Sequence, residues 1–128
     1  MIKKYIYLLV GLSLLHLMSC NEDDGSMEED QAELIEMARQ IEALATAPCN
    51  ETSTCNYVAF GSKACGGPQK YLAYNESAVN LAEFLQLIAQ YNAMEAAFNE
   101  RWNIISDCLL IAAPTKAICG SSGCELQY

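Results

Sequence analysis

Apolar residues spaced three and four positions apart predict a first long helix at residues 27–47. The stripe that they form along the helix consists of Leu34, Ala38, Ile41 and Ala45. At its start, Ser26 and Glu29 have the spacing of a capping box, in which each side chain accepts a hydrogen bond from the other residue's backbone N–H. Pro48 ends the pattern, because proline breaks a helix.

A second and longer stripe predicts a helix at residues 78–103, about 40 Å long at 1.5 Å per residue. Either Asn75 or Ser77 has the side chain needed to cap it. We expect one buried face along its whole length. That face contains Phe84, Ile88, Tyr91, Met94, Phe98, Trp102 and Ile105.

Shorter runs predict the strands. Residues 56–60 and 71–74 have strand composition and are separated by a loop rich in glycine. Residues 109–113 are wholly apolar and predict a buried strand that ends at Pro114. Residues 116–119 and 124–128 predict a terminal hairpin around a Gly-Ser-Ser-Gly turn. The chain is therefore expected to be α+β, with two long helices packed on a small antiparallel sheet and braced by disulfides.

The first twenty residues have the three-part pattern of a secretory signal peptide. Lys3 and Lys4 precede an apolar run, which closes at Leu17-Met18-Ser19-Cys20. A membrane-spanning helix is the alternative. It needs about 20 apolar residues, and this run is shorter and interrupted.

Leu17-Met18-Ser19-Cys20 resembles the lipobox of bacterial lipoproteins. The resemblance implies cleavage before Cys20 and attachment of acyl chains such as palmitate to its thiol and its new amino terminus. The mature protein would then be held at a membrane by several acyl chains, each of whose buried methylenes contributes about 0.8 kcal/mol. The alternative is an ordinary secreted protein with Cys20 as a spare thiol.

The residues after Cys20 are Asn21, Glu22, Asp23 and Asp24, and they resemble the surface-export signal of Bacteroidetes lipoproteins. The resemblance implies an outer-membrane protein exposed at the cell surface, whereas the alternative is a solvated acidic spacer. We divide the chain into a signal peptide at residues 1–19, an acidic tether at 20–26 and one cysteine-rich α+β domain at 27–128.

Charge and composition exclude several classes of function. The chain has 7 basic and 16 acidic residues, and cleavage would remove Lys3 and Lys4. This balance is unfavourable for nucleic-acid binding, which needs a basic face. The only histidine, His16, lies in the signal peptide, so the mature chain would have no histidine for catalysis or for a metal site. The acidic residues gather at positions 21–42, without a calcium-loop motif, and are expected to be solvated.

Once Cys20 is lipidated, six cysteines remain, which suits three disulfides in an oxidising compartment. They are Cys49, Cys55, Cys65, Cys108, Cys119 and Cys124. Zinc is the alternative, but the spacing lacks paired knuckles. Six cysteines allow fifteen pairings. A chain running back along the second helix would bring Cys65 to Cys108, and the other four could close two local loops, Cys49 with Cys55 and Cys119 with Cys124.

Residues 61–68, the Ser-Asp-Cys run ending at Cys108 and the paired terminal cysteines resemble a small group of cysteine-rich bacterial secreted proteins. The resemblance covers most of residues 49–128. It implies one fold and carries no activity.

The leading functional hypothesis is a surface-anchored lipoprotein that acts as a non-catalytic binding or structural module. It would need no cofactor, and its partners would be the membrane, through the lipid, and an unknown protein or glycan. The alternative is a serine protease inhibitor that presents Lys63 from an exposed loop with Ser62 and Ala64. An enzyme is the third hypothesis. Its carboxylates would come from Asp107, Glu76, Glu83, Glu95 and Glu100, although the sequence marks no catalytic pair among them.

Overall fold

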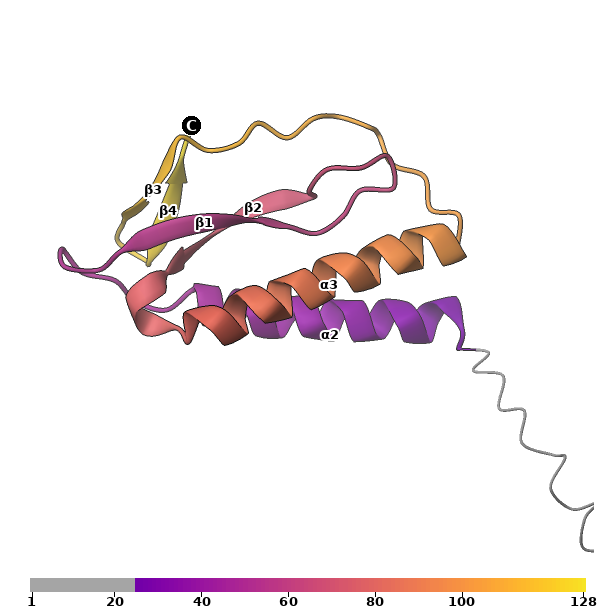
Figure 1. Cartoon of the computed structure of the whole chain (residues 1–128), viewed down its shortest axis with the longest axis horizontal. Coiled ribbons are helices and arrows are strands. Elements are labelled where there is room, and N and C mark those ends of the chain that lie inside the picture. The colour runs from indigo at the N-terminus through magenta and orange to yellow at the C-terminus, as the bar shows by residue number, and fades with distance from the viewer. Residues whose placement is uncertain (1–24) are drawn as a thin grey trace, which may run out of the picture.

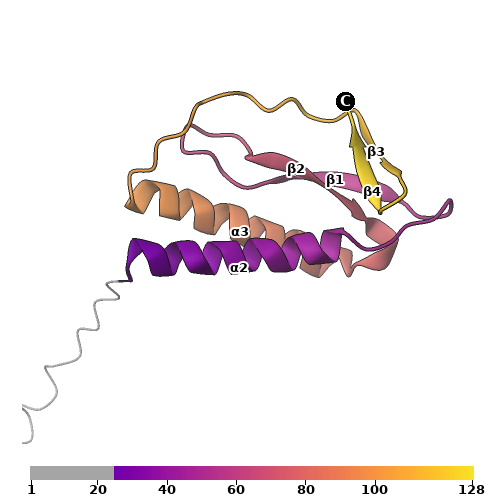
Figure 2. The ribbon, with the colours of Figure 1, turned by 180° about the vertical axis from the view of Figure 1, so that it is seen from behind.

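The computed structural model describes residues 25–128 and has two helices beside two small antiparallel sheets, which confirms the α+β fold (Figure 1). Seen from both sides, the helices lie next to each other in one layer and the strands lie above them (Figures 1 and 2). The elements are α2 (Met27–Ala45), β1 (Cys55–Phe60), β2 (Lys70–Asn75), the short 3-10 helix η2 (Glu76–Ala78), α3 (Leu81–Arg101), β3 (Lys116–Cys119) and β4 (Cys124–Gln127).

The capping box at the start of α2 is confirmed. The Glu29 N–H donates to Ser26 Oγ at 3.2 Å, and the Ser26 N–H donates to the Glu29 carboxylate at 2.9 Å. Three acidic residues in the first turn also suit the positive end of the helix dipole. The helix ends at Ala45, two residues before the expected boundary.

The second helix begins later than expected because Asn75 caps a different element. Its side-chain oxygen accepts from the Ser77 N–H at 3.0 Å and so caps η2. Its amide also donates to the Pro48 carbonyl at 2.8 Å, which satisfies a buried side chain. The longer helix α3 starts at Leu81 after Asn80, whose side chain makes no capping hydrogen bond.

The hydrophobic core lies between the helix layer and the β1–β2 sheet. The helices α2 and α3 and the strands β1 and β2 contribute its buried residues, and two aromatic pairs join the layers. Phe60 of β1 stacks on Tyr91 of α3 with 4.5 Å between ring centroids, and Tyr74 of β2 lies 4.9 Å from Phe84. The buried apolar residues are Leu34, Ile41, Ala45, Phe60, Tyr74, Phe84, Ile88 and Tyr91.

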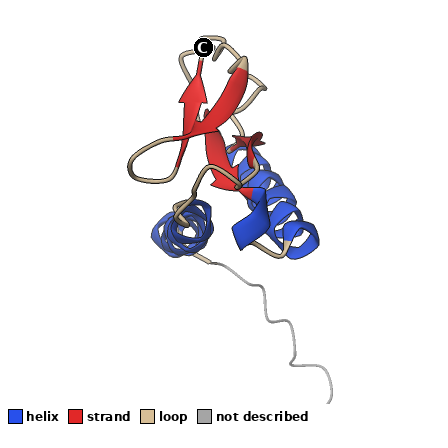
Figure 3. Cartoon of the chain, turned by 90° about the vertical axis from the view of Figure 1, so that its left-hand side faces the viewer, coloured by secondary structure: helices blue, strands red, loops and turns tan. Residues whose placement is uncertain are grey.

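The strands form two separate hairpins instead of one sheet. β1 pairs with β2 from Cys55 opposite Asn75 to Phe60 opposite Lys70. β3 pairs with β4, and Cys119 lies opposite Cys124, which confirms the predicted terminal hairpin. Viewed end-on, the small hairpin lies on the far side of β1–β2 from the helices (Figure 3).

Two expectations about residues 102–114 are wrong. The apolar run at 109–113 is not a buried strand: it has no regular secondary structure, and Leu110 is 95% exposed. Ile105 does not extend the buried face of α3 and is 93% exposed. The physical reason is that α3 ends at Arg101 and Asn103 takes a left-handed φ of 51°, so the chain leaves the helix axis.

The structure contains three disulfides, but only one of the expected pairings. The Cys65–Cys108 bond is confirmed. The two local loops are wrong, since Cys49 bonds to Cys119 and Cys55 bonds to Cys124. Side chains directly opposite in a hairpin point to the same face. Cys119 and Cys124 therefore both reach the neighbouring layer instead of each other.

Candidate interaction site

Lys63 is buried, which corrects the expectation that it lies exposed at a loop tip. The residue is only 8% exposed. Its ammonium donates to Asp107 Oδ1 at 2.9 Å and to the Leu109 carbonyl at 2.8 Å. The lysine thus ties the β1–β2 loop to the chain after α3 and is not presented to a partner.

The rest of this loop is held against α3 by polar side chains. Asn92 Oδ1 accepts from the Gly61 N–H at 2.7 Å, and the Asn99 amide donates to the Ser62 carbonyl at 2.7 Å. The Glu95 carboxylate accepts from the Ser62 N–H. Gly61 has φ 83°, a conformation that favours glycine. Of the predicted loop Ser62-Lys63-Ala64, only Ala64 is exposed.

Two of the carboxylates suggested for an enzyme already have partners within the domain. Glu95 is used to hold the loop, and Asp107 is paired with Lys63. The hydrogen bond from Lys63, followed by that from the Leu109 N–H, lowers the pKa of Asp107 below its ordinary value. Burial, with Glu95 and Glu42 nearby, raises the pKa of Tyr91 to about 12. The Asp107 carboxylate therefore stays ionised and the Tyr91 phenol stays neutral near pH 7.

The exposed apolar segment lies between Cys108 and Pro114, and we call residues 109–113 the strap. All five residues are apolar and exposed, with Leu109 at 65%, Leu110 at 95% and Ile111 at 36%. In both side views the strap runs over the strands on the side away from the helices (Figures 1 and 2). A single exposed leucine is ordinary, whereas five consecutive exposed apolar residues form the kind of patch that is common at interaction sites.

The strap is fixed at its two ends and unpaired between them. At one end, Cys108 is bonded to Cys65 and the Leu109 carbonyl accepts from Lys63. At the other, Pro114 is buried and the Thr115 N–H donates to the Gln127 carbonyl at 2.7 Å. Within residues 25–128, no hydrogen bond involves the backbone of residues 110–113. The strap therefore offers free backbone donors and acceptors beside apolar side chains.

The sequence pattern did not reveal this surface. An apolar run of five residues between turn signals is typical of a buried strand, and periodicity cannot distinguish the two. The available signal was its position. It lies between Cys108, whose disulfide partner is far along the chain, and Pro114, which cannot donate a backbone hydrogen bond to a strand ladder.

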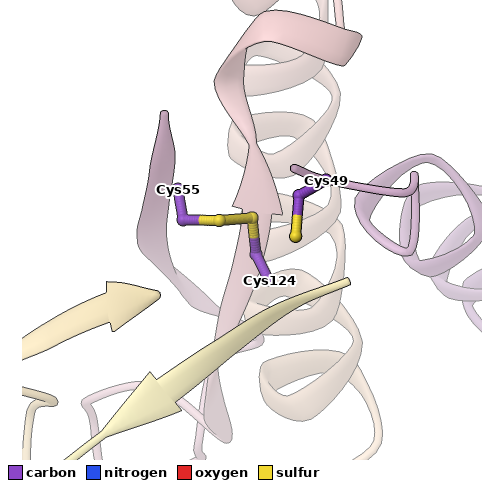
Figure 4. A group of neighbouring side chains, drawn as sticks. All are labelled: Cys49, Cys55 and Cys124. Atoms are coloured by element: carbon purple, nitrogen blue, oxygen red, sulfur yellow. A yellow bond between two sulfur atoms is a disulfide. The ribbon is translucent and has the colours of Figure 1, made fainter. Parts of the chain in front are cut away.

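Three cysteine sulfur atoms lie close together where β1 and β4 begin. Those of Cys49, Cys55 and Cys124 lie within 4.8 Å of one another, a spacing that would suit a metal ion. In Figure 4 the Cys55–Cys124 bond is visible with Cys49 beside it. Each of the three is committed to a disulfide, so none carries the thiolate that metal coordination requires. In this oxidised form the cluster is a covalent junction between layers.

The predicted lipidation site Cys20 and the export residues Asn21, Glu22, Asp23 and Asp24 lie outside the described residues. Within residues 25–128, no helix has the length and apolar character that crossing a membrane requires.

Compared with known protein families, curated proteins and solved structures, the chain matches none of them.

Proposed function

We propose that this protein is a lipid-anchored lipoprotein at the surface of the bacterial outer membrane, and that its folded part is a non-catalytic binding module. The observation that carries the binding function is the strap at residues 109–113. Its five apolar side chains are exposed, and the backbone of residues 110–113 makes no hydrogen bond in the described chain.

The chemistry of the strap favours an extended peptide segment of a partner protein. Unpaired N–H and C=O groups on an extended chain bind a second strand through backbone hydrogen bonds, while alternate side chains add apolar contacts. The strap carries no charge from residue 109 to 115, so the complementary segment is uncharged and apolar. A lipid surface fits less well, because hydrocarbon leaves backbone polar groups unsatisfied.

The position of the strap suits presentation away from an anchor. The chain continues toward Cys20 from the start of α2, which belongs to the helix layer, whereas the strap lies on the other side of the strands (Figure 1). The burial of Lys63 weighs against the protease-inhibitor alternative, because its ammonium already has two partners within the domain.

Selection from a displayed library of eight-residue peptides, followed by amide NMR, would test the binding function. We expect apolar peptides that shift the resonances of residues 110–113. Leu110→Ser should weaken their binding about tenfold, since exposed anchor residues carry much of an interface's energy. Ala112→Pro should do the same by removing one backbone donor. Leu44→Ser on α2 is the matched control, because Leu44 is also exposed but lies in the helix layer.

Binding assays with phospholipid vesicles and with a glycan array could contradict this proposal. Strap-dependent binding to phospholipid vesicles would assign a lipid surface, and strap-dependent binding to a glycan array would assign a carbohydrate. Peptides that bind Leu110→Ser and Ala112→Pro as well as the wild type would remove the strap as the site.

Acyl labelling tests the anchor separately. Wild-type cells should incorporate label that Cys20→Ala loses, whereas equal labelling would refute lipidation at Cys20. Replacing Glu22, Asp23 and Asp24 by alanine should lower the accessibility of the protein to protease on intact cells. Unchanged accessibility would leave these acids as a spacer.

A further inference from the structure

The Cys65–Cys108 disulfide differs from the other two in its surroundings. Both of its residues are exposed, whereas Cys49, Cys55, Cys119 and Cys124 are all half-buried. It also joins two segments without secondary structure, while the other two bonds fasten the β3–β4 hairpin to β1 and the loop before it. A reductant in solution therefore reaches this bond more readily than the others.

The backbone at Cys108 adds a second reason for a labile bond. Cys108 has a φ of 54°, in the left-handed region that residues with a Cβ rarely adopt. The only other described non-glycine residue with a positive φ is Asn103, and asparagine tolerates that conformation better. Opening the disulfide would let Cys108 return to an ordinary conformation, and relief of strain favours the reduced form.

We propose that Cys65–Cys108 is a redox-sensitive disulfide that holds the start of the strap. A dithiol reduces this bond while the other two disulfides stay intact. One thiolate of the dithiol attacks a sulfur of the bond, forms a mixed disulfide and releases the other cysteine as a thiolate. The second thiol of the reductant then attacks the mixed disulfide. After protonation both cysteines are free thiols in the protein. The reductant has supplied two electrons and is released as a cyclic disulfide.

Reduction loosens the strap at one end without detaching it. The Ser106 carbonyl lies 3.8 Å from the Cys65 sulfur and 3.6 Å from the Cys108 sulfur, so it can accept from either new thiol. Lys63 still binds Asp107 and the Leu109 carbonyl. The open form therefore keeps its fold and its hairpin junction but holds the first residues of the strap less firmly.

The consequence for binding rests on the proposed function. A strap held at both ends is pre-organised to receive a peptide, and loosening it adds an ordering cost to binding. Reduction would then weaken peptide binding. The redox property itself is independent of any partner.

Graded reduction of the wild-type protein tests the proposal directly. The folded protein is equilibrated with increasing dithiothreitol, its free thiols are alkylated, and the modified cysteines are mapped by mass spectrometry. We expect Cys65 and Cys108 to be half-modified at a dithiothreitol concentration about tenfold below that needed for the other four cysteines. Simultaneous reduction of all three bonds, or earlier opening of Cys55–Cys124 or Cys49–Cys119, would overturn the proposal.

Limited proteolysis measures the effect on the strap. Chymotrypsin should cut the selectively reduced and alkylated protein after Leu109 or Leu110 at least about fivefold faster than the oxidised protein, because a loosened segment enters a protease cleft more readily. The double variant Cys65→Ser/Cys108→Ser should be cut at the faster rate without reductant. Equal rates for the oxidised and selectively reduced wild-type protein would show that the bond does not fasten the strap. Both measurements omit peptide ligands, so their failure is distinct from failure of the binding function.

Discussion

The terminal hairpin and the strap are neighbouring parts of one chain that the fold treats in opposite ways. The β3–β4 hairpin has backbone pairing and two half-buried disulfides, one to β1 and one to the loop before it. The strap has no backbone pairing at residues 110–113 in the described chain, and one exposed disulfide holds its start. The hairpin is more polar than the strap, so hydrophobicity alone did not decide which segment is covered.

The difference shows what disulfides do in a small domain. A hairpin with two strands of four residues is too small to be stable alone. The main core lies between the helices and β1–β2, and the hairpin contributes no residue to it. Covalent bonds therefore take the place of apolar burial at the hairpin, as is common in small secreted domains. The strap, fastened only at its ends, keeps its apolar side chains in solvent.

The largest expected effect is the loss of the hairpin junction. The two bonds overlap along the chain, with Cys55 inside the loop that Cys49–Cys119 closes and Cys124 just outside it. In the chain-entropy model the first bond closes a loop of about 70 residues and contributes about 4 kcal/mol. The second then closes only a short ring and adds about 3 kcal/mol. Replacing Cys49, Cys55, Cys119 and Cys124 by serine should cost about 7 kcal/mol, measured by urea unfolding, which is comparable with the whole stability of a small domain.

The matched control is Cys65→Ser/Cys108→Ser. Its 43-residue separation corresponds to about 4 kcal/mol. Relief of the left-handed backbone at Cys108 offsets about 1–2 kcal/mol of that. This variant should therefore stay folded. Equal losses in the two variants would contradict the distinction between the hairpin and the strap.

The second effect is the loss of the lysine that holds the strap. Lys63→Ala removes two hydrogen bonds from a buried ammonium and should lower the free energy of unfolding by about 1–3 kcal/mol. Lys116→Ala, at an exposed position on β3, should change it by less than about 0.5 kcal/mol. Urea unfolding of both variants makes the comparison. Similar small losses would mean that the disulfide alone fixes the strap.

A third change should affect the hairpin and the strap equally. Ser26→Ala removes the side-chain cap of α2 and should cost about 1 kcal/mol, because the Glu29 N–H loses its ordered partner. The order in which the disulfides open should stay the same. Thermal unfolding with Ser121→Ala as the control measures the cost, and a changed order would show that α2 acts selectively on one region.

The smallest expected effect is a loosening of the strap in acid. Lys63 and the Leu109 N–H hold the pKa of Asp107 below its ordinary value of 3.8. A carboxyl group with a depressed folded-state pKa contributes stability above the unfolded-state value, and this contribution is lost as the pH falls through the folded-state pKa. Pepsin should therefore cut the strap a few-fold faster as the pH drops below 3.8. Each rate is compared with Asp107→Asn at the same pH, and parallel profiles would rule out Asp107 as the cause.

Local sequence determined much of the fold. The two helices, the capping box, the β1–β2 strands and the terminal hairpin all follow from periodicity, capping and turn residues. These signals depend on near neighbours in the chain, so they can be recognised without knowing how the layers pack. Even the Cys65–Cys108 bond was predictable, because a helix of known length sets how far the chain must run back.

Only the tertiary structure decided the features that bear on function. Cys119 and Cys124 lie opposite each other, yet each bonds to the other layer because both side chains point toward it. Lys63 is surrounded by turn-forming residues, yet it is buried because Asp107 and the Leu109 carbonyl meet its ammonium there. Residues 109–113 have the composition of a buried strand, yet in the described chain no strand pairs with them and they remain exposed. Pairing, burial and exposure depend on residues distant in sequence, and those residues become neighbours only when the layers assemble.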